Sequence, residues 1–139
     1  MILPILKVIP DERGVDTWTF SANLPSACCP VSGNPRPGST ILIFCRPQGL
    51  VLDVLTIDPY LRSYVGGFKD ETGTIVERNM EGMIALIAQH CANAVGVPVG
   101  ITANLIIHPH NHLSIIVRKK PEEASVEPMP EGFEKLFGR

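Results

Sequence analysis

The sequence has no excess of charge of either sign. Its 139 residues include 12 Lys and Arg against 14 Asp and Glu, a formal net charge of -2 at pH 7. A protein whose main affinity is for nucleic-acid phosphates needs clustered basic residues, so this balance argues against that class and favours a small ligand. With 45% hydrophobic residues, the chain is large enough to bury a core as one globular domain.

A long hydrophobic run is also missing. The first ten residues are apolar apart from Lys7, but two prolines interrupt them and they contain no basic leader. They fall short of the run of about 20 apolar residues that a membrane span needs. We therefore expect a cytoplasmic protein with no membrane partner.

Paired cysteine motifs are absent as well. The four cysteines are Cys28, Cys29, Cys45 and Cys91, and no two of them form a CxxC pair. The adjacent Cys28 and Cys29 are poorly placed to bridge each other. The sequence therefore predicts free thiols.

One of these thiols lies in a loop of restricted backbone. Cys29 is followed by Pro30 and by Gly33, between two runs of strand-like composition. Proline and glycine fix the shape of such a turn, which is how a chain positions a reactive cysteine. The alternative is a thiol that only packs in its loop. Cys28 is expected to face the other way and to have no chemical role.

Periodicity predicts the elements around this loop. We expect strands at 15–24 and 39–45, a short extended run at 50–54, and a helix capped by Thr56 or Asp58 that has Pro59 in its first turn and ends at Gly66. A longer helix is predicted over 75–95, with Gly96 as its stop signal. Strands at 101–107 and 113–117 follow, joined by a five-residue connection.

The predicted order is ββααββ. It indicates an α+β fold in which an antiparallel four-stranded sheet carries both helices on one face, within a single domain over 1–120. Residues 121–139 form a tail rich in Pro and Glu, in which Phe133, Leu136 and Phe137 predict a short docking helix.

The cysteine loop resembles that of a known enzyme family. Cys29-Pro30-Val31-Ser32-Gly33 is similar to the Cys-Pro-(Val/Ile)-(Thr/Ser)-Gly loop of the 7-cyano-7-deazaguanine reductases. Cys45-Arg46-Pro47 falls where that family has Tyr-x-Pro, residues 53–64 align without a gap on its Glu-Ser-Lys-Ser-Leu-Lys segment, and Val76-Glu77 falls at its His-Glu. The resemblance covers roughly residues 15–119.

The resemblance implies a fold and a set of roles. It implies the tunnelling fold, in which ββααββ subunits form an oligomeric barrel with sites between subunits. Cys29 would attack the carbon attached to position 7 of a deazaguanine base, and Glu77 would hold the guanine-like edge of that base with two hydrogen bonds. Asp53 aligns on the motif glutamate and would help to orient the base.

The departures from the family pattern change the expected reaction. Leu55 and Asp58 stand where the reductases have the two lysines for the phosphorylated nicotinamide cofactor, and Val76 replaces a histidine. No cofactor is therefore expected. Arg36 occupies the position of the family's acid, seven residues after the cysteine. A guanidinium holds an anion but does not transfer a proton at neutral pH, so the group on C7 should be negative.

These features lead to one main hypothesis and two alternatives. The first is a non-redox enzyme that removes the carboxylate of 7-carboxy-7-deazaguanine, with Arg36 orienting the carboxylate, Glu77 holding the base, and Cys29 or a water giving a proton to C7. The second is an archaeosine-type amidinotransferase that captures a nitrile as a thioimide on Cys29. The third is a base-binding subunit without catalysis.

Several of these residues also have a purely structural interpretation. Glu77 could act on the helix macrodipole, and Asp53 could be a solvated acid at a strand end. His108, His110 and His112 alternate as strand ligands would, but they fall in a turn that contains Pro109. We expect these histidines to be exposed turn residues, with no metal site.

Overall fold

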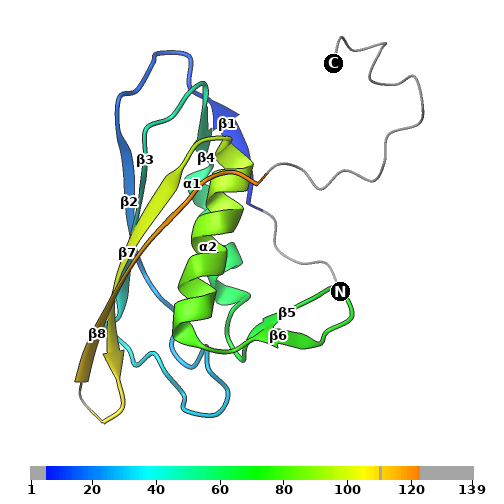
Figure 1. Ribbon diagram of the computed structural model, residues 1–139, viewed down its shortest axis with the longest axis vertical. Coiled ribbons are helices and arrows are strands. Elements are labelled where there is room, and N and C mark those ends of the chain that lie inside the picture. Colours follow the sequence, from blue (N-terminus) through cyan, green and yellow to red (C-terminus); the bar gives the residue numbers. More distant parts are fainter. Residues whose placement is uncertain (1–5, 110, 123–139) are drawn as a thin grey trace.

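The computed structural model describes residues 6–109 and 111–122, which form an α+β domain (Figure 1). Its elements in chain order are β1 (Val8–Pro10), β2 (Trp18–Asn23), β3 (Thr40–Cys45), β4 (Leu50–Leu52), α1 (Val54–Arg62), β5 (Phe68–Lys69), β6 (Ile75–Glu77), α2 (Met80–Val95), β7 (Val99–Ile107) and β8 (Asn111–Lys119).

The main sheet confirms the predicted fold class. It has four antiparallel strands in the order β2-β3-β7-β8. Figure 1 shows both helices on one side of this sheet. The strands come from two hairpins distant in sequence, and the pairing of β3 with β7 joins them.

The two faces of the sheet differ sharply in burial, because successive side chains of a strand point to opposite faces. Ile41 and Ile43 of β3 and Ile101 of β7 point to the helices and are at most 1% exposed. Their neighbours Leu42 and Thr102 point the other way and are less buried. We call the face without helices the open face, and its alternation makes the sheet amphipathic.

Helix α2 supplies most of the apolar layer above the sheet. Its buried residues, spaced at three and four, are Met80, Met83, Ile84, Ile87, Ala88, Cys91, Ala92 and Val95. The helix ends at Gly96, whose φ of 76° is the left-handed conformation that glycine adopts without a steric penalty, as the sequence predicted. Its predicted start was wrong, because residues 75–77 form β6 and pair with β5.

Helix α1 also begins elsewhere than predicted. Asp53, not Thr56 or Asp58, is its N-cap, and the Asp53 carboxylate accepts a hydrogen bond of 3.1 Å from the Leu55 N–H. The Thr56 hydroxyl donates to the Asp53 carbonyl at 2.7 Å. Pro59 therefore lies in the middle of the helix, not in its first turn. The helix ends at Arg62, before Gly66.

Two short antiparallel pairs were not predicted. β1 pairs with β4, and β5 pairs with β6 across a turn in which Asp70 Oδ1 accepts from the Thr72 and Thr74 N–H groups. The β7–β8 connection is also shorter than predicted, because Ile107 pairs with Asn111. The predicted helix at Phe133, Leu136 and Phe137 lies outside the described residues.

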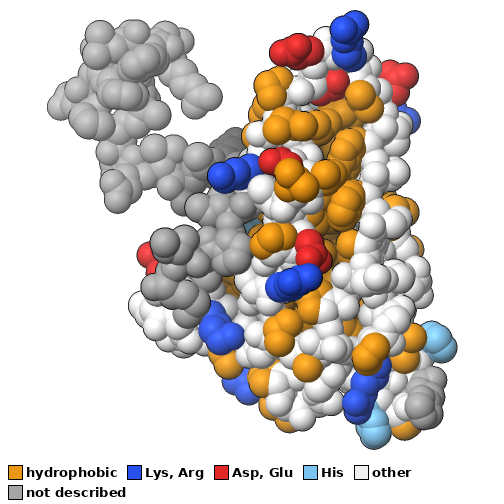
Figure 2. Space-filling view, turned by 180° about the vertical axis from the view of Figure 1, so that it is seen from behind, with side chains coloured by type: hydrophobic (Ala, Val, Ile, Leu, Met, Phe, Trp, Pro, Cys, Tyr) orange, Lys and Arg blue, Asp and Glu red, His pale blue; other side chains and the backbone are white. Residues whose placement is uncertain are grey.

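Seen from behind, the molecule shows hydrophobic side chains gathered in a band over its upper half (Figure 2). Large exposed hydrophobic residues occur on β1, on β4 and at the start of α1, where Ile9 is 47% exposed and Leu55 is 82% exposed. Among the helices that the structure describes, none is long and apolar enough to cross a membrane.

Candidate active site

The loop between β2 and β3 holds Cys29 by hydrogen bonds within the loop. The Cys29 N–H donates to the Asn34 carbonyl at 2.8 Å, and the Gly33 N–H donates to the Cys29 carbonyl at 2.9 Å. Gly33 has a φ of 72°, which an L side chain would strain. The proline and glycine pattern therefore closes a tight turn around the thiol, as predicted.

The same loop is fastened to the end of strand β7. The Arg36 N–H donates to the Ile106 carbonyl at 2.7 Å, and the His108 N–H donates to Asn34 Oδ1 at 2.8 Å. The Ser39 hydroxyl, which is fully buried, donates to the Arg36 carbonyl and accepts from the Ile106 N–H. These bonds fix the position of the thiol relative to the sheet.

The two adjacent cysteines have opposite environments. Cys28 is 1% exposed, its thiol donates to the Pro25 carbonyl, and burial raises its pKa to about 11. Cys29 is only half-buried, and hydrogen bonding from Ser32 lowers the pKa of its thiol, with a smaller contribution from the positive charge of Arg78. The Ser32 N–H lies 3.5 Å from Cys29 Sγ. Cys29 is thus the more acidic and the more accessible thiol.

Cys29 lines a small cavity together with the beginning of α2. The cavity has a volume of about 200 Å³ and is bounded by Cys29, Asn34, Arg78, the first residues of α2, and the hairpin residues Ile107 and Leu113. Three segments distant in sequence therefore meet around the thiol: the cysteine loop, the end of the β7–β8 hairpin and the N-terminus of α2. Sequence reasoning missed Arg78, which is the cation of this cavity.

Arg36 lies on the other side of the sheet. It lines a separate cavity of about 530 Å³ with Ile106 and His108, and Arg36 Nη2 lies 3.0 Å from His108 Nδ1. A guanidinium only donates, so His108 Nδ1 accepts this bond. Ile106 and Ile107 are successive residues of β7 and face opposite ways, so the two cavities lie on opposite faces. The structure does not bring Arg36 and Cys29 together in one cavity.

Glu77 lies beside the Cys29 cavity without lining it. Its Oε1 accepts hydrogen bonds from the Arg78 and Asn79 N–H groups at 3.1 and 2.9 Å. A Cβ at Gly82 would come within 2.2 Å of Glu77 Oε2, so this glycine leaves the room that the carboxylate occupies. Glu77 therefore sits at the N-terminus of α2, where a negative charge is favourable. No hydrogen bond of Oε2 to the described residues is found.

Asp53 has a structural role as the N-cap of α1. Its N–H donates to the Lys7 carbonyl at 2.8 Å, which ties the cap to the segment before β1. Asp53 does not line the Cys29 cavity. The predicted contact with a base therefore has no support from its position.

The histidines of the β7–β8 turn are only partly described. His108 contacts Arg36, His112 is exposed on β8, and His110 lies outside the described residues. Over residues 6–109 and 111–122, no group of three His, Cys, Asp or Glu side chains is arranged to hold a metal ion.

A buried polar cluster was missed from the sequence. The Tyr60 hydroxyl lies 2.6 Å from both the Tyr64 hydroxyl and His90 Nδ1, so it links α1 to α2. Burial raises the pKa of both tyrosines and lowers the pKa of His90. The spacing of Tyr60 and Tyr64 places them on one side of a helix, but nothing in the sequence indicates His90 as their partner.

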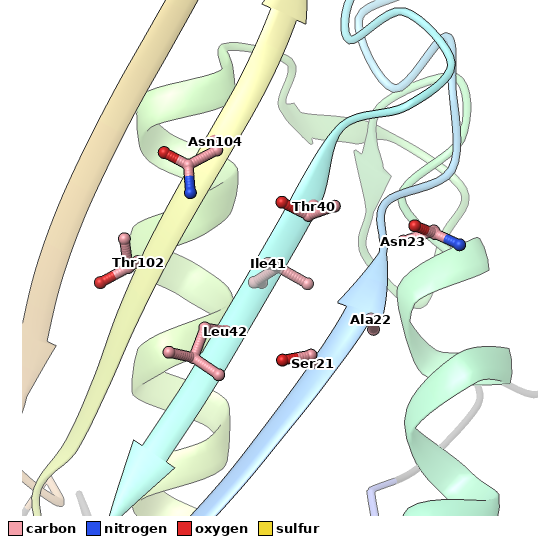
Figure 3. A pocket seen from close by; sticks show the side chains of 8 residues that line it. All are labelled: Ser21, Ala22, Asn23, Thr40, Ile41, Leu42, Thr102 and Asn104. Carbon is pink, nitrogen blue, oxygen red and sulfur yellow. The ribbon is translucent and has the colours of Figure 1, made fainter.

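The open face carries a polar hollow of about 360 Å³ (Figure 3). Side chains of three neighbouring strands line it: Ser21, Asn23, Thr40, Leu42, Thr102 and Asn104. Figure 3 shows them spread along β2, β3 and β7, with the helices behind the sheet. Among the described residues no titratable group lines the hollow, and its polar groups are neutral hydroxyls and amides beside the apolar Ala22, Ile41 and Leu42.

Cys29 and Arg78 are therefore the pair that the fold brings together, with Glu77 at the edge of their cavity. Neither a scan against protein-family models nor a search of curated proteins found a match to this chain.

Proposed function

We propose that the chain is a tunnelling-fold subunit of a non-redox enzyme that acts on a 7-substituted 7-deazaguanine, with removal of the carboxylate of 7-carboxy-7-deazaguanine as its main reaction. The observation that carries this proposal is the cavity in which Cys29 and Arg78 meet the N-terminus of α2. It unites a proton-carrying group with a cation for an anionic substituent.

The assembly of such subunits finds support in the sheet. β2 and β8 are its two edge strands, and in the described part of the chain each pairs on one side only. An unpaired edge is a template for another strand, so edge-to-edge pairing of copies would close a barrel. Trp18 and Phe20 stack at the β2 edge with ring centroids 6.0 Å apart, and both are only half-buried. Their burial would favour the same contact.

In this mechanism Arg78 takes the role that the sequence suggested for Arg36. Its guanidinium would hold the substrate carboxylate by paired hydrogen bonds and orient it beside Cys29. The free Oε2 of Glu77 would accept an N–H of the base, while Oε1 stays bonded to the helix N-terminus. Ile107 and Leu113 give the cavity apolar lining that would exclude water from the ring.

The chemical step is a proton transfer followed by loss of carbon dioxide. The Cys29 thiol gives its proton to C7, which forms a new C–H bond. The bond between C7 and the carboxylate carbon then breaks, its electron pair returns to the ring, and water reprotonates the thiolate. A thiol of lowered pKa is the stronger acid, so hydrogen bonding from Ser32 favours the transfer.

The same lowered pKa favours a second candidate, nitrile capture. A stabilised thiolate is a better-populated nucleophile and could add to a 7-cyano substituent as a thioimide, from which ammonia would displace the sulfur. The position of Arg36 on the other face removes one objection to a neutral nitrile at Cys29. This is the amidinotransferase alternative.

Incubation with each base, followed by mass spectrometry, separates the candidates. Decarboxylation predicts that 7-carboxy-7-deazaguanine loses the mass of carbon dioxide, at a rate that falls as pH rises through the pKa of Cys29, because the proton donor is lost. Nitrile capture predicts a protein adduct with 7-cyano-7-deazaguanine that grows with pH and is missing in Cys29→Ala. Tight binding of either base without turnover or adduct would identify a binding subunit and contradict both reactions.

A further inference from the structure

The largest of the cavities described lies at the end of the sheet remote from the cysteine loop. It has a volume of about 710 Å³, within the range of about 300–1,000 Å³ typical of ligand sites. Arg46 and Arg118 line it, together with the neutral polar residues Thr17 and Gln48. No Asp or Glu of the described chain lines this cavity, although the whole chain carries a net charge of -2.

Short residues between the end of α2 and the beginning of β7 line this cavity. Around the start of β7 the cavity is lined by Gly96, Pro98 and Gly100, none of which has a long side chain. Gly100 pairs with Arg118 of β8 on one side and with Phe44 of β3 on the other. Arg46 follows two residues after Phe44. Arg46 and Arg118 both line the cavity, and in the sheet Gly100 lies between Phe44 and Arg118.

Phe44 forms an apolar wall of this cavity. A Cβ on Gly100 would lie 2.3 Å from the tip of the Phe44 ring, so the ring lies directly against the Gly100 backbone. The arrangement requires glycine at this position. An aromatic wall beside two guanidinium groups combines a surface for stacking with donors for an anion.

The charges around the cavity favour an anion. Gly96 marks the carboxyl end of α2, whose macrodipole opposes an anion with about half an elementary charge, but the two arginines supply two full positive charges. Guanidinium groups bind phosphate by paired hydrogen bonds. We propose that the Arg46–Arg118 cavity binds the phosphate group of a nucleotide, whose base stacks near Phe44. This site is separate from the Cys29 cavity and does not depend on the reaction proposed there.

The phosphate belongs either to a free nucleotide or to a nucleic-acid strand. A strand would also have to contact the open face of the sheet. Its outward positions on β2, β3, β7 and β8 hold no acidic residue, and the polar hollow of Figure 3 adjoins the arginine cavity in the sheet register. Arg36 lies at the far end, next to Ile106. Ile106 lies six positions after Gly100 on β7, about 20 Å along the strand, so a single phosphate cannot reach both ends.

Calorimetric titration with guanosine monophosphate, guanosine and a short single-stranded oligodeoxynucleotide tests the site. We expect the monophosphate to bind at least about tenfold more tightly than guanosine, and Arg46→Met and Arg118→Met each to weaken it about tenfold. Rising salt should weaken it further. Arg62→Met is the matched control, because Arg62 is exposed on α1 and pairs only with Asp58 in the described structure.

Any of three results would overturn the proposal. These are equal affinity for guanosine and its monophosphate, unchanged affinity of both arginine variants for the monophosphate, and no binding of either phosphate ligand. In the unaltered protein, the monophosphate should also protect Arg46 and Arg118, but not Arg62, from phenylglyoxal, which tests the site without a substitution. The source of the phosphate follows from Arg36→Met. If the site holds a nucleic-acid strand, Arg36→Met should weaken binding of the oligonucleotide about tenfold and leave binding of the monophosphate unchanged. If the site holds a free nucleotide, Arg36→Met should change neither affinity.

Discussion

The arginines on the two faces of the sheet have different neighbours. On the helix side, Arg78 shares a small cavity with a half-buried thiol of lowered pKa. On the open side, Arg36 lines a separate cavity and contacts His108, and no cysteine lines that cavity. The arginine nearer to Cys29 in sequence is therefore not the one that shares its cavity. Of these two arginines, Arg78 is the one that shares a cavity with a thiol of lowered pKa.

The difference arises because successive residues of β7 face opposite sides of the sheet, so residues of one loop contact different faces. Residues 27–38 cross from one face to the other, since Cys29 lines a cavity with Ile107 and Arg36 lines one with Ile106. A change of one position along β7 moves a contact to the opposite face. Distance in sequence is thus a poor guide to which loop residues work together.

The largest expected effect comes from removing the thiol. Cys29→Ala should lower turnover of 7-carboxy-7-deazaguanine about hundredfold or more, because the proton donor is lost. The rate of carbon dioxide release measures it. The matched control is Cys28→Ala, since the neighbouring thiol faces the core. Equal losses in the two variants would remove the distinction between the two cysteines.

A second contrast compares the buried Tyr60 cluster between the helices with a polar residue of the open face. Tyr60→Phe removes the hydroxyl that lies 2.6 Å from both Tyr64 and His90 and leaves these two only their longer mutual contact of 3.4 Å, so we expect a loss of about 1–3 kcal/mol in the free energy of unfolding. Thr102→Val on the open face should change it by about 0.5 kcal/mol or less. Urea unfolding of both variants gives the comparison, and a larger loss for Thr102→Val would contradict it.

Replacing each arginine in turn tests which of the two contributes to turnover. Arg78→Met should lower turnover about tenfold, since it removes the guanidinium expected to hold the carboxylate. Arg36→Met should stay within about twofold, because its cavity is on the other face. Steady-state kinetics of both variants decide the point. A reversed order would restore the interpretation drawn from the sequence.

The smallest expected effect is a dependence of stability on pH. Burial lowers the pKa of His90 below that of the unfolded chain, so the unfolded state binds more protons as pH falls past about 6.5. The contribution of neutral His90 to the free energy of unfolding is therefore complete above that pH and declines below it. Thermal unfolding between neutral and mildly acidic pH should show a drop that is smaller in His90→Gln. An equal drop in both proteins would exclude His90 as the cause.

The sequence predicted much of the fold because the strongest signals are local. The composition and alternation of the strand-like runs predicted the strands of the main sheet, and Gly96 predicted the end of α2. The start of α1 was missed because Asp53, Thr56 and Asp58 are all good caps, and the bond from the Asp53 N–H to the Lys7 carbonyl is a contact distant in sequence. The short β5–β6 pair was missed because residues 75–77 also continue the helical pattern of α2.

The site was less predictable than the fold. The tight turn around Cys29 could be predicted, since proline and glycine act locally. Its partner could not be found in the same way, because the cavity joins the loop to Arg78 through packing of α2 on the sheet. The link from Tyr60 to His90 is likewise a contact between two helices, which no local pattern reveals.

The pH dependence of Cys29 alkylation by iodoacetamide tests the central claim most directly. Peptide mapping of the unaltered protein should show Cys29 reacting before Cys28, with a midpoint below that of a free thiol. Arg78→Met should move that midpoint to higher pH, because a positive charge near the thiolate is lost, and Arg36→Met should leave it in place. A midpoint that moves with Arg36→Met and not with Arg78→Met would contradict the account.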